Sequence, residues 1–266
     1  MERSIGQRFI GAFLVGGAIA FCTQIIMMVV GMVLPIKDLV PPVTLVVLGF
    51  TGMVLVLCGA YKKISDVGGF GAGIMFCGLV NAVANIFMGG AMEGGGKESA
   101  GMRAVAKFAV VVLGFIVVVG TVLGVLLAHT PGVLAAMDHG AAVAKLNPGM
   151  LVFLYAFLVG GLISIEGQVF LEFTPLPEPA VILGNAALGM ALSIFGVSTQ
   201  LEVLAGAGLI ATVVDAGASA VLGGATLAIH GTPSRAIVFT LVMVLVVAMG
   251  IICGRVLLGR AKANRR

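Results

Sequence analysis

The sequence predicts an all-α integral membrane protein with two repeated units. Each unit is expected to hold three transmembrane helices and one glycine-broken, re-entrant helical segment. Three observations support this fold class. The composition is too apolar for a soluble protein, apolar stretches of membrane-spanning length recur along the chain, and the second half repeats patterns of the first.

Composition decides the class of protein. Of the 266 residues, 60% are hydrophobic and only 10% are charged, and the mean hydropathy is +1.21. A soluble domain carries roughly 25% charged residues because its surface must face water. The 40 glycines are also typical of membrane helices, which use small residues for close packing. A soluble enzyme is therefore excluded.

Apolar stretches divide the chain into its expected elements. A helix needs about twenty apolar residues to cross a bilayer. Six stretches meet this need, at residues 9–34, 42–60, 104–128, 151–170, 180–197 and 236–258. Two further apolar stretches are interrupted by glycine, at residues 67–90 and 201–231. The predicted organisation is a first membrane repeat (9–128), a linker (129–150), a second membrane repeat (151–258) and a basic cytoplasmic tail (259–266).

An internal repeat relates the two halves. Residues 12–24 read AFLVGGAIAFCTQ and residues 156–168 read AFLVGGLISIEGQ. Further along, Gly59 corresponds to Gly196, and the Gly-x-Gly at residues 69–71 corresponds to that at residues 206–208. The matched glycines and glutamines in one order indicate a duplication. They also argue that the first apolar stretch is a structural helix and not a cleaved signal peptide.

The number of crossings in each unit sets the orientation of the repeat. If the glycine-broken stretches re-enter, each unit crosses three times and the two units are inverted. Twelve of the fifteen Lys and Arg residues then lie on the cytoplasmic side, against ten if those stretches cross fully and the units are parallel. The positive-inside rule favours the inverted arrangement, which recurs in transporters. Both arrangements place both termini in the cytoplasm, in a bacterial inner membrane.

Polar side chains inside the apolar stretches are candidate functional residues, because they are costly there unless they face protein or water. Gln24 and Gln168 occupy matching positions and are expected to approach each other near the pseudo-twofold axis. They serve either to bind a carboxylate or to join helices. Glu166 and Asp215 have no acidic counterpart in the first unit, which suggests proton or cation coupling. The structural alternatives are that Glu166 reaches the interface and that Asp215 caps a helix.

The glycine-broken segments are the expected pathway. Unwound backbone at membrane depth survives where it lines a cavity or is buried in protein. The following helix would point its positive N-terminus and free N–H groups at an anion, with Asn81 and Asn85 on one helix face along the path. Tight packing of small residues is the alternative. The glycines concerned are Gly69, Gly71, Gly73, Gly206 and Gly208.

No pattern in the sequence indicates catalysis. Nucleophile–base pairs, metal-ligand spacings and phosphate-binding loops are lacking, so we expect neither an enzyme nor a bound cofactor or metal. The basic C-terminal cluster follows an apolar stretch and lacks interleaved aromatics, which favours a cytoplasmic anchor over a nucleic-acid contact. The expected partners are the lipid bilayer, a small anionic solute and, as a further alternative, other membrane subunits or a homo-oligomer.

Several motifs resemble the SpoVA sporulation membrane proteins, specifically the C and Eb members. They are FLVGG-x5-GQ at residues 157–168, LAGAG at 204–208, GFGAG at 69–73, Asn-Ala-Val at 81–83 and Lys-Phe at 107–108. The chain looks like two such proteins fused. It departs from the family at residues 74–80 and 209–217, which lack the family's usual proline and Thr-Gly-Phe.

The resemblance implies a role in moving dipicolinic acid, a pyridine dicarboxylate, across spore membranes, and one family member is thought to be a tension-sensitive channel. The leading hypothesis is therefore a channel or transporter for a small anionic metabolite such as dipicolinate or a related carboxylate. The alternative is an integral-membrane assembly subunit that transports nothing by itself. The departures leave room for another solute or for a duty outside sporulation.

Overall fold

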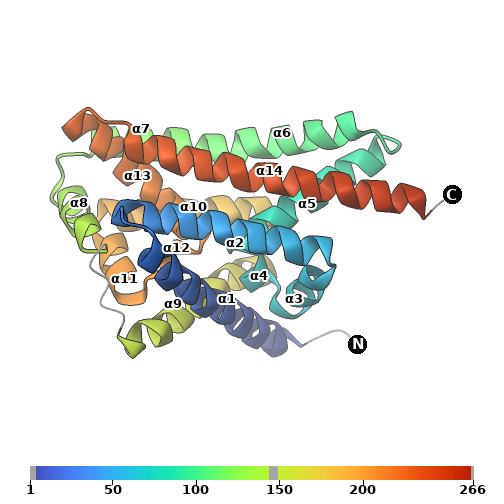
Figure 1. Cartoon of the computed structure of the whole chain (residues 1–266), viewed down its shortest axis with the longest axis horizontal. Helices are drawn as coiled ribbons and strands as arrows, with labels where there is room; N and C mark the ends of the chain where they lie inside the picture. The colour runs from blue at the N-terminus through green and yellow to red at the C-terminus, as the bar shows by residue number, and fades with distance from the viewer. Residues whose placement is uncertain (1–3, 144–148, 265–266) are drawn as a thin grey trace.

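The computed structural model describes residues 4–143 and 149–264, and α-helices dominate this part of the chain (Figure 1). The first unit contains α1 (Ile5–Val33), η1 (Lys37–Leu39), α2 (Val40–Leu57), α3 (Ala60–Gly68), α4 (Phe70–Gly73), α5 (Phe76–Glu93), α6 (Glu98–Gly114), the π-helical turn η2 (Phe115–Val119) and α7 (Gly120–Leu126). The second unit contains α9 (Met150–Phe173), α10 (Glu178–Ile194), α11 (Val197–Ala205), α12 (Ala207–Ile210), α13 (Val213–His230) and α14 (Ser234–Ala263), and α8 (Pro131–Val143) lies between the units.

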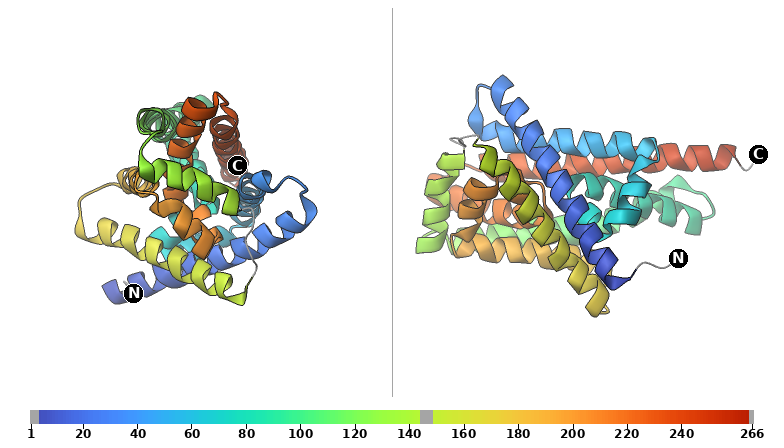
Figure 2. Two further views of the ribbon diagram at one scale, coloured as in Figure 1. Left: turned by 90° about the vertical axis from the view of Figure 1, so that its left-hand side faces the viewer. Right: turned by 90° about the horizontal axis from the view of Figure 1, so that it is seen from below.

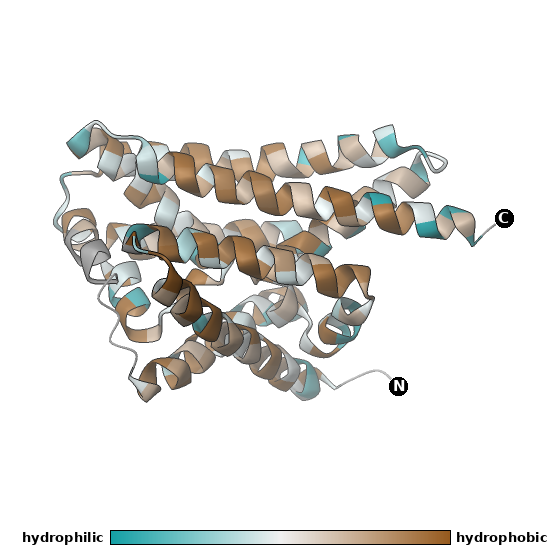
Figure 3. Ribbon diagram, viewed as in Figure 1, coloured by the Kyte–Doolittle hydropathy of each residue, from teal (hydrophilic) through white to brown (hydrophobic). Residues whose placement is uncertain are grey.

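The fold is that of a multi-pass membrane protein. Among the described residues, seven helices are long and apolar enough to cross a bilayer, and the pair α10–α11, bent by 102°, would be an eighth. Figure 3 shows hydrophobic residues along the long helices and hydrophilic ones gathered near the helix ends. Outward side chains such as Val110 and Val118 are more than half exposed. Such faces suit lipid, because α-helices satisfy their own backbone hydrogen bonds.

Local sequence explains where these helices begin. Ser4 and Gln7 form a capping box at the start of α1, in which each side chain accepts a hydrogen bond from the other residue's backbone N–H. Proline occupies the first turn of α2 and of α10, where a missing N–H costs nothing. Gly59 and Gly196 both adopt a left-handed conformation, with φ of 75° and 74°, at the bends before α3 and α11.

The first helices of the two units, α1 and α9, cross in antiparallel directions (Figure 2). Phe9 stacks on Phe173 at one end of the contact, and Phe21 packs against Phe153 at the other. Between them, a Cβ atom added to Gly16 would lie 1.8 Å from Ser164 Oγ, so only glycine fits. The repeated Gly-Gly pair is therefore the crossing point of two helices.

The breaks in the two glycine-broken segments meet at the centre of the molecule. Met75 and Thr212 form an antiparallel bridge. The Phe76 N–H donates to the Ala211 carbonyl at 3.0 Å, and the Val213 N–H donates to the Ile74 carbonyl at 3.2 Å. The residues in these two bonds correspond to each other in the repeat, so the contact is reciprocal, as expected across a twofold axis.

Each broken segment enters and leaves at one end of the molecule. In Figure 1, α3 and the end of α5 lie toward the end that carries both termini, whereas α11 and the end of α13 lie toward the opposite end. This arrangement is the one expected of two re-entrant hairpins pointing in opposite directions, and α5 and α13 are also each long and apolar enough to cross a bilayer. The position of the bilayer, and with it the inverted orientation, stays a prediction.

Some predicted boundaries differ from the structure. The predicted linker contains α8, which packs against α11 through the Thr199 hydroxyl and the Ala136 carbonyl, 3.1 Å apart. The third span begins at Glu98, so the polar loop before it is only residues 94–97. Helix α14 continues to Ala263, and the basic tail is therefore largely helical. Hydropathy marks only the apolar part of a helix. The backbone hydrogen bonds of α6 and α14 continue into the polar residues at one end of each helix.

Candidate functional site

A cavity of about 930 Å³ lies between α1, α2, α13 and α14. Its lining includes Asp38, His230 and Arg235, in segments at the end of the molecule that lies away from the termini in Figure 1. Its deep part includes Gln24 and Asp215 and reaches Ile210, close to the central break. The cavity therefore leads from one end of the molecule to the point where the two broken segments meet.

An acid pair lies in this cavity. Asp215 is 6% exposed, and the Ser219 hydroxyl lies 3.5 Å from its Oδ2 atom. Glu202 from α11 interacts with Asp215, and Arg235 is near enough to interact electrostatically with both. The cavity thus holds two carboxyl groups beside one guanidinium.

The predicted helix cap at Asp215 is wrong. Thr212 is the N-cap residue of α13, and Asp215 lies within the first helical turn. Its carboxyl group interacts with Glu202 from this first turn. Glu202 was missed from the sequence, although an acidic residue in a long apolar segment was a usable signal. Its counterpart in the first unit is Ser65, so the pair belongs to the second unit alone.

The two glutamines at matching positions of the repeat do not meet, contrary to expectation. Gln24 Oε1 accepts the Ala207 N–H at 2.9 Å, and Gln168 Oε1 accepts the Phe70 N–H at 2.9 Å. Because α1 and α9 are antiparallel and cross near Gly16, the glutamines lie on opposite sides of the crossing, about 12 Å from it along each helix. Each glutamine joins its own unit to the broken segment of the other unit.

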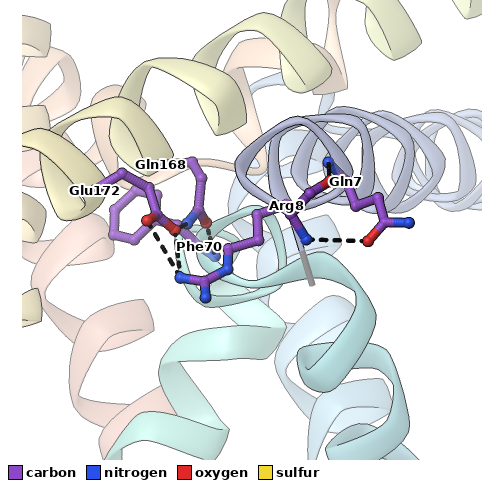
Figure 4. Close-up of polar contacts among 6 residues, drawn as sticks. Gln7, Arg8, Phe70, Gln168 and Glu172 are labelled. Atoms are coloured by element: carbon purple, nitrogen blue, oxygen red, sulfur yellow. Dashed lines mark hydrogen bonds and ion pairs between the residues drawn. The ribbon is translucent and has the colours of Figure 1, made fainter. Parts of the chain in front are cut away.

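The surroundings of the two glutamines differ, and Figure 4 shows those of Gln168. The Gln168 amide donates to Glu172 Oε1 at 2.9 Å. Arg8 Nη1 donates to both carboxylate oxygens of Glu172, at 3.1 and 3.2 Å. Gln24, in contrast, lines the cavity. Gln168 therefore contacts an ion pair, whereas the matching Gln24 faces the cavity.

The glycines of the broken segments pack against protein. Gly69 and Gly206 have φ near +50° and lie directly against Gln168 Oε1 and Gln24 Oε1. A Cβ atom at Gly71 would lie 2.2 Å from the Ala12 carbonyl oxygen. The equivalent close contact of Gly208 is with Ala156, and a Cβ atom at Gly73 would lie 3.0 Å from Glu178 Oε1.

These contacts favour close packing, the alternative to an anion pathway, as the role of the segments. The first N–H group of α4, α5, α12 and α13 is bound by a glutamine or carbonyl oxygen, so that group is not free for an anion. None of the five predicted glycines is among the residues that line the cavity, and α12 contributes Ile210 instead. The reason is steric, since glycine permits helices to touch as well as to unwind.

Three further candidates lie away from the cavity lining. Asn81 is half-buried and Asn85 is exposed on α5. Glu166 interacts with Asn185 of α10. Glu166 Oε2 and Asn185 Oδ1 have no hydrogen-bond partner in the part of the chain that the structure describes. In that same part, no cluster of three or more metal-ligating side chains is found.

The fold and its site define a class of protein. It is a multi-pass helical membrane protein in which each unit binds the broken segment of the other, and a cavity lined in part by polar groups reaches its centre. Residues 8–130, which span the first unit, match the model of the SpoVAC/SpoVAEB sporulation membrane protein family. The family resemblance is thereby confirmed, and it marks this chain as similar to a sporulation membrane protein. A search of curated proteins and of solved structures found no match.

Proposed function

We propose that this protein is a channel or transporter for a small anionic metabolite, and that the cavity is one half of its pathway. The observation that carries the proposal is the cavity itself, about 930 Å³ in volume, which extends from one end of the molecule to its centre. Small-molecule sites have volumes of roughly 300–1,000 Å³, with a few convergent polar groups. Basic residues of α3 and α14 at the terminus end support a cytoplasmic location for both termini.

The charges in the cavity favour an anion that enters together with protons. Arg235 supplies a positive charge that can pair with a carboxylate. Glu202 and Asp215 would repel a dicarboxylate when both are ionised, and a proton shared between them would relieve that repulsion. Dipicolinate, which the family resemblance suggests, is our candidate solute. Proton coupling through Asp215 then follows, whereas Glu166 lies outside the cavity lining.

Flux of labelled dipicolinate through proteoliposomes, with and without osmotic downshift, tests this function. We expect protein-dependent flux that falls roughly tenfold in Arg235→Gln, since a hydrogen bond to a charged group contributes about 1.5–3 kcal/mol. Arg255→Gln, which removes an arginine that pairs with Glu98 outside the cavity, is the matched control. Flux that is unaffected by Arg235→Gln would contradict the proposed pathway.

The same vesicles test whether solute flux is coupled to proton movement. An inward proton gradient should accelerate flux in the wild type, and Asp215→Asn should abolish that response while Glu166→Gln retains it. Loss of the response in Glu166→Gln alone would assign the coupling to the other acid. Dependence on osmotic downshift would indicate a channel, and independence of it would indicate a carrier.

An assembly subunit is the second candidate, and the tight packing of the broken segments favours it. Gly71 and Gly208 are pressed against backbone carbonyl groups, and they leave no space for a solute at those positions. A subunit of this kind would give no flux for any tested anion and would co-purify with partner membrane proteins.

A further inference from the structure

Several residues that line the cavity have repeat counterparts on the other side of the pseudo-twofold axis, and three of these counterparts form an ion-paired network. The first helices of the units align with an offset of 144 residues, the difference between Gln168 and Gln24. Glu172 then corresponds to Met28 and Arg8 corresponds to Val152. Gln24, Met28 and Val152 all line the cavity. Their three counterparts are the members of the hydrogen-bonded network in Figure 4.

We propose that Arg8 and Glu172 form a latch that closes the half of the pathway at the terminus end, and that the cavity is the open counterpart of this closed half. The proposal rests on the proposed function, because a latch presupposes a pathway. Opening separates the N-terminal turns of α1 from the C-terminal turns of α9. The stacked rings of Phe9 and Phe173, with centroids 6.2 Å apart, part at the same time.

The latch is connected to the broken segment. Gln168 donates to Glu172 through its amide nitrogen and accepts the Phe70 N–H through its oxygen. A change in the ion pair is therefore transmitted through one side chain to the start of α4. On the cavity side, Gln24 makes the equivalent bond to Ala207, but Met28 and Val152 carry no charges to hold their helices together.

The strength of the ion pair suits a reversible closure. The Arg8 side chain is 43% exposed and that of Glu172 is 14% exposed. A partly exposed pair is weak enough to break during a cycle. Two hydrogen bonds from one guanidinium nitrogen and a third from Gln168 give the closed state a defined geometry.

Thiol accessibility tests the latch without any transport assay. Gly73 is the counterpart of the cavity-lining Ile210, so Gly73→Cys in a cysteine-free background reports on the closed half. A membrane-impermeant maleimide is applied from the terminus side of reconstituted protein. We expect slow labelling with the latch intact and labelling roughly fivefold faster in Arg8→Gln or Glu172→Gln, the factor by which such a pair favours closure.

Two further variants keep the test decisive. The charge exchange Arg8→Glu/Glu172→Arg should restore slow labelling, and Arg8→Lys should lie between, because lysine keeps the charge but loses the fixed fork of the guanidinium. Arg255→Gln, which breaks the exposed Arg255–Glu98 pair (3.6 Å), should leave the rate unchanged. If a single variant fails to fold, the exchange and the lysine variant carry the test.

The outcomes separate the latch from the function. Unchanged labelling in folded Arg8→Gln and Glu172→Gln overturns the latch, even if dipicolinate flux is observed. Faster labelling that the charge exchange reverses supports the latch, even if the tested solute does not pass. Faster labelling that Arg255→Gln produces equally would overturn it, because general loosening would then explain the effect.

Discussion

Two glutamine side chains fasten the broken backbone of each unit to the first helix of the other. Gln24 is 2% exposed and Gln168 is 6% exposed, so the bonds to Ala207 and Phe70 are shielded from solvent. A buried backbone N–H that loses its partner is costly, and this is more so where no water can replace it. The glycine before each donor makes the contact possible, because its positive φ turns the next N–H toward the glutamine.

Replacing Gln24 by methionine should therefore destabilise the protein. The variant keeps the length of the side chain but leaves the Ala207 N–H without an acceptor, at a cost of about 1–3 kcal/mol. The measurement is the free energy of unfolding in detergent. Gln200→Met is the matched control, since Gln200 is exposed on α11. Equal stability of the two variants would show that the buried bond contributes nothing.

At the scale of helices, small residues set the distance between α1 and α9. Gly16 faces Ser164 and Gly160, and Gly160 faces Ala20, so the two backbones touch at the crossing. The phenylalanine of each motif packs edge-on against its counterpart, with ring centroids of Phe13 and Phe157 5.5 Å apart. The two copies of the repeated motif thus pack against each other and form the contact between α1 and α9.

A valine at the crossing should disrupt it. Gly16→Val places a branched side chain where Ser164 Oγ lies, and overpacking of this kind costs about 1–3 kcal/mol or more. Gly6→Val is the control in the same helix, because nothing lies within 4 Å of the added Cβ. Thermal unfolding followed by size-exclusion chromatography measures the difference. A melting temperature equally unchanged in both variants would contradict the close crossing.

At the scale of the whole molecule, the two units are interlocked around a twofold axis but differ in charge. The reciprocal bonds at Met75 and Thr212 follow the axis. Glu202 and Asp215 on one side, and the Arg8–Glu172 pair on the other, break the symmetry. One half holds the cavity and the other holds the ion pair, and this is the asymmetry that the proposed single gate requires.

The direction of the broken segments can be tested by labelling from one side of the membrane. If they re-enter, Lys97→Cys between α5 and α6 lies on the same side as Ser4→Cys near the N-terminus. If they cross fully, it lies on the opposite side. Thr232→Cys, between α13 and α14, faces away from the N-terminus in both cases and is the positive control. We expect an impermeant reagent outside the cell to label Thr232→Cys and to leave Lys97→Cys unlabelled.

Local sequence was sufficient to predict the class of protein and most of its long helices. An apolar composition excludes a water-facing surface, and runs of about twenty apolar residues predict helices whatever their neighbours are. The match over residues 8–130 confirmed, for the first unit, the family resemblance that the motifs suggested. These features could be read because hydropathy and motifs are local properties of the chain.

Only the tertiary structure decided which polar groups act together. Arg8 and Glu172 are 164 residues apart, and Gln24 binds a backbone group 183 residues away. Glu202 was recognised as a candidate site residue only from its contact with Asp215 in the cavity. Helical periodicity shows which face of a helix is apolar, but it does not show which helix lies against that face. The partners of a side chain therefore depend on the packing of the whole chain.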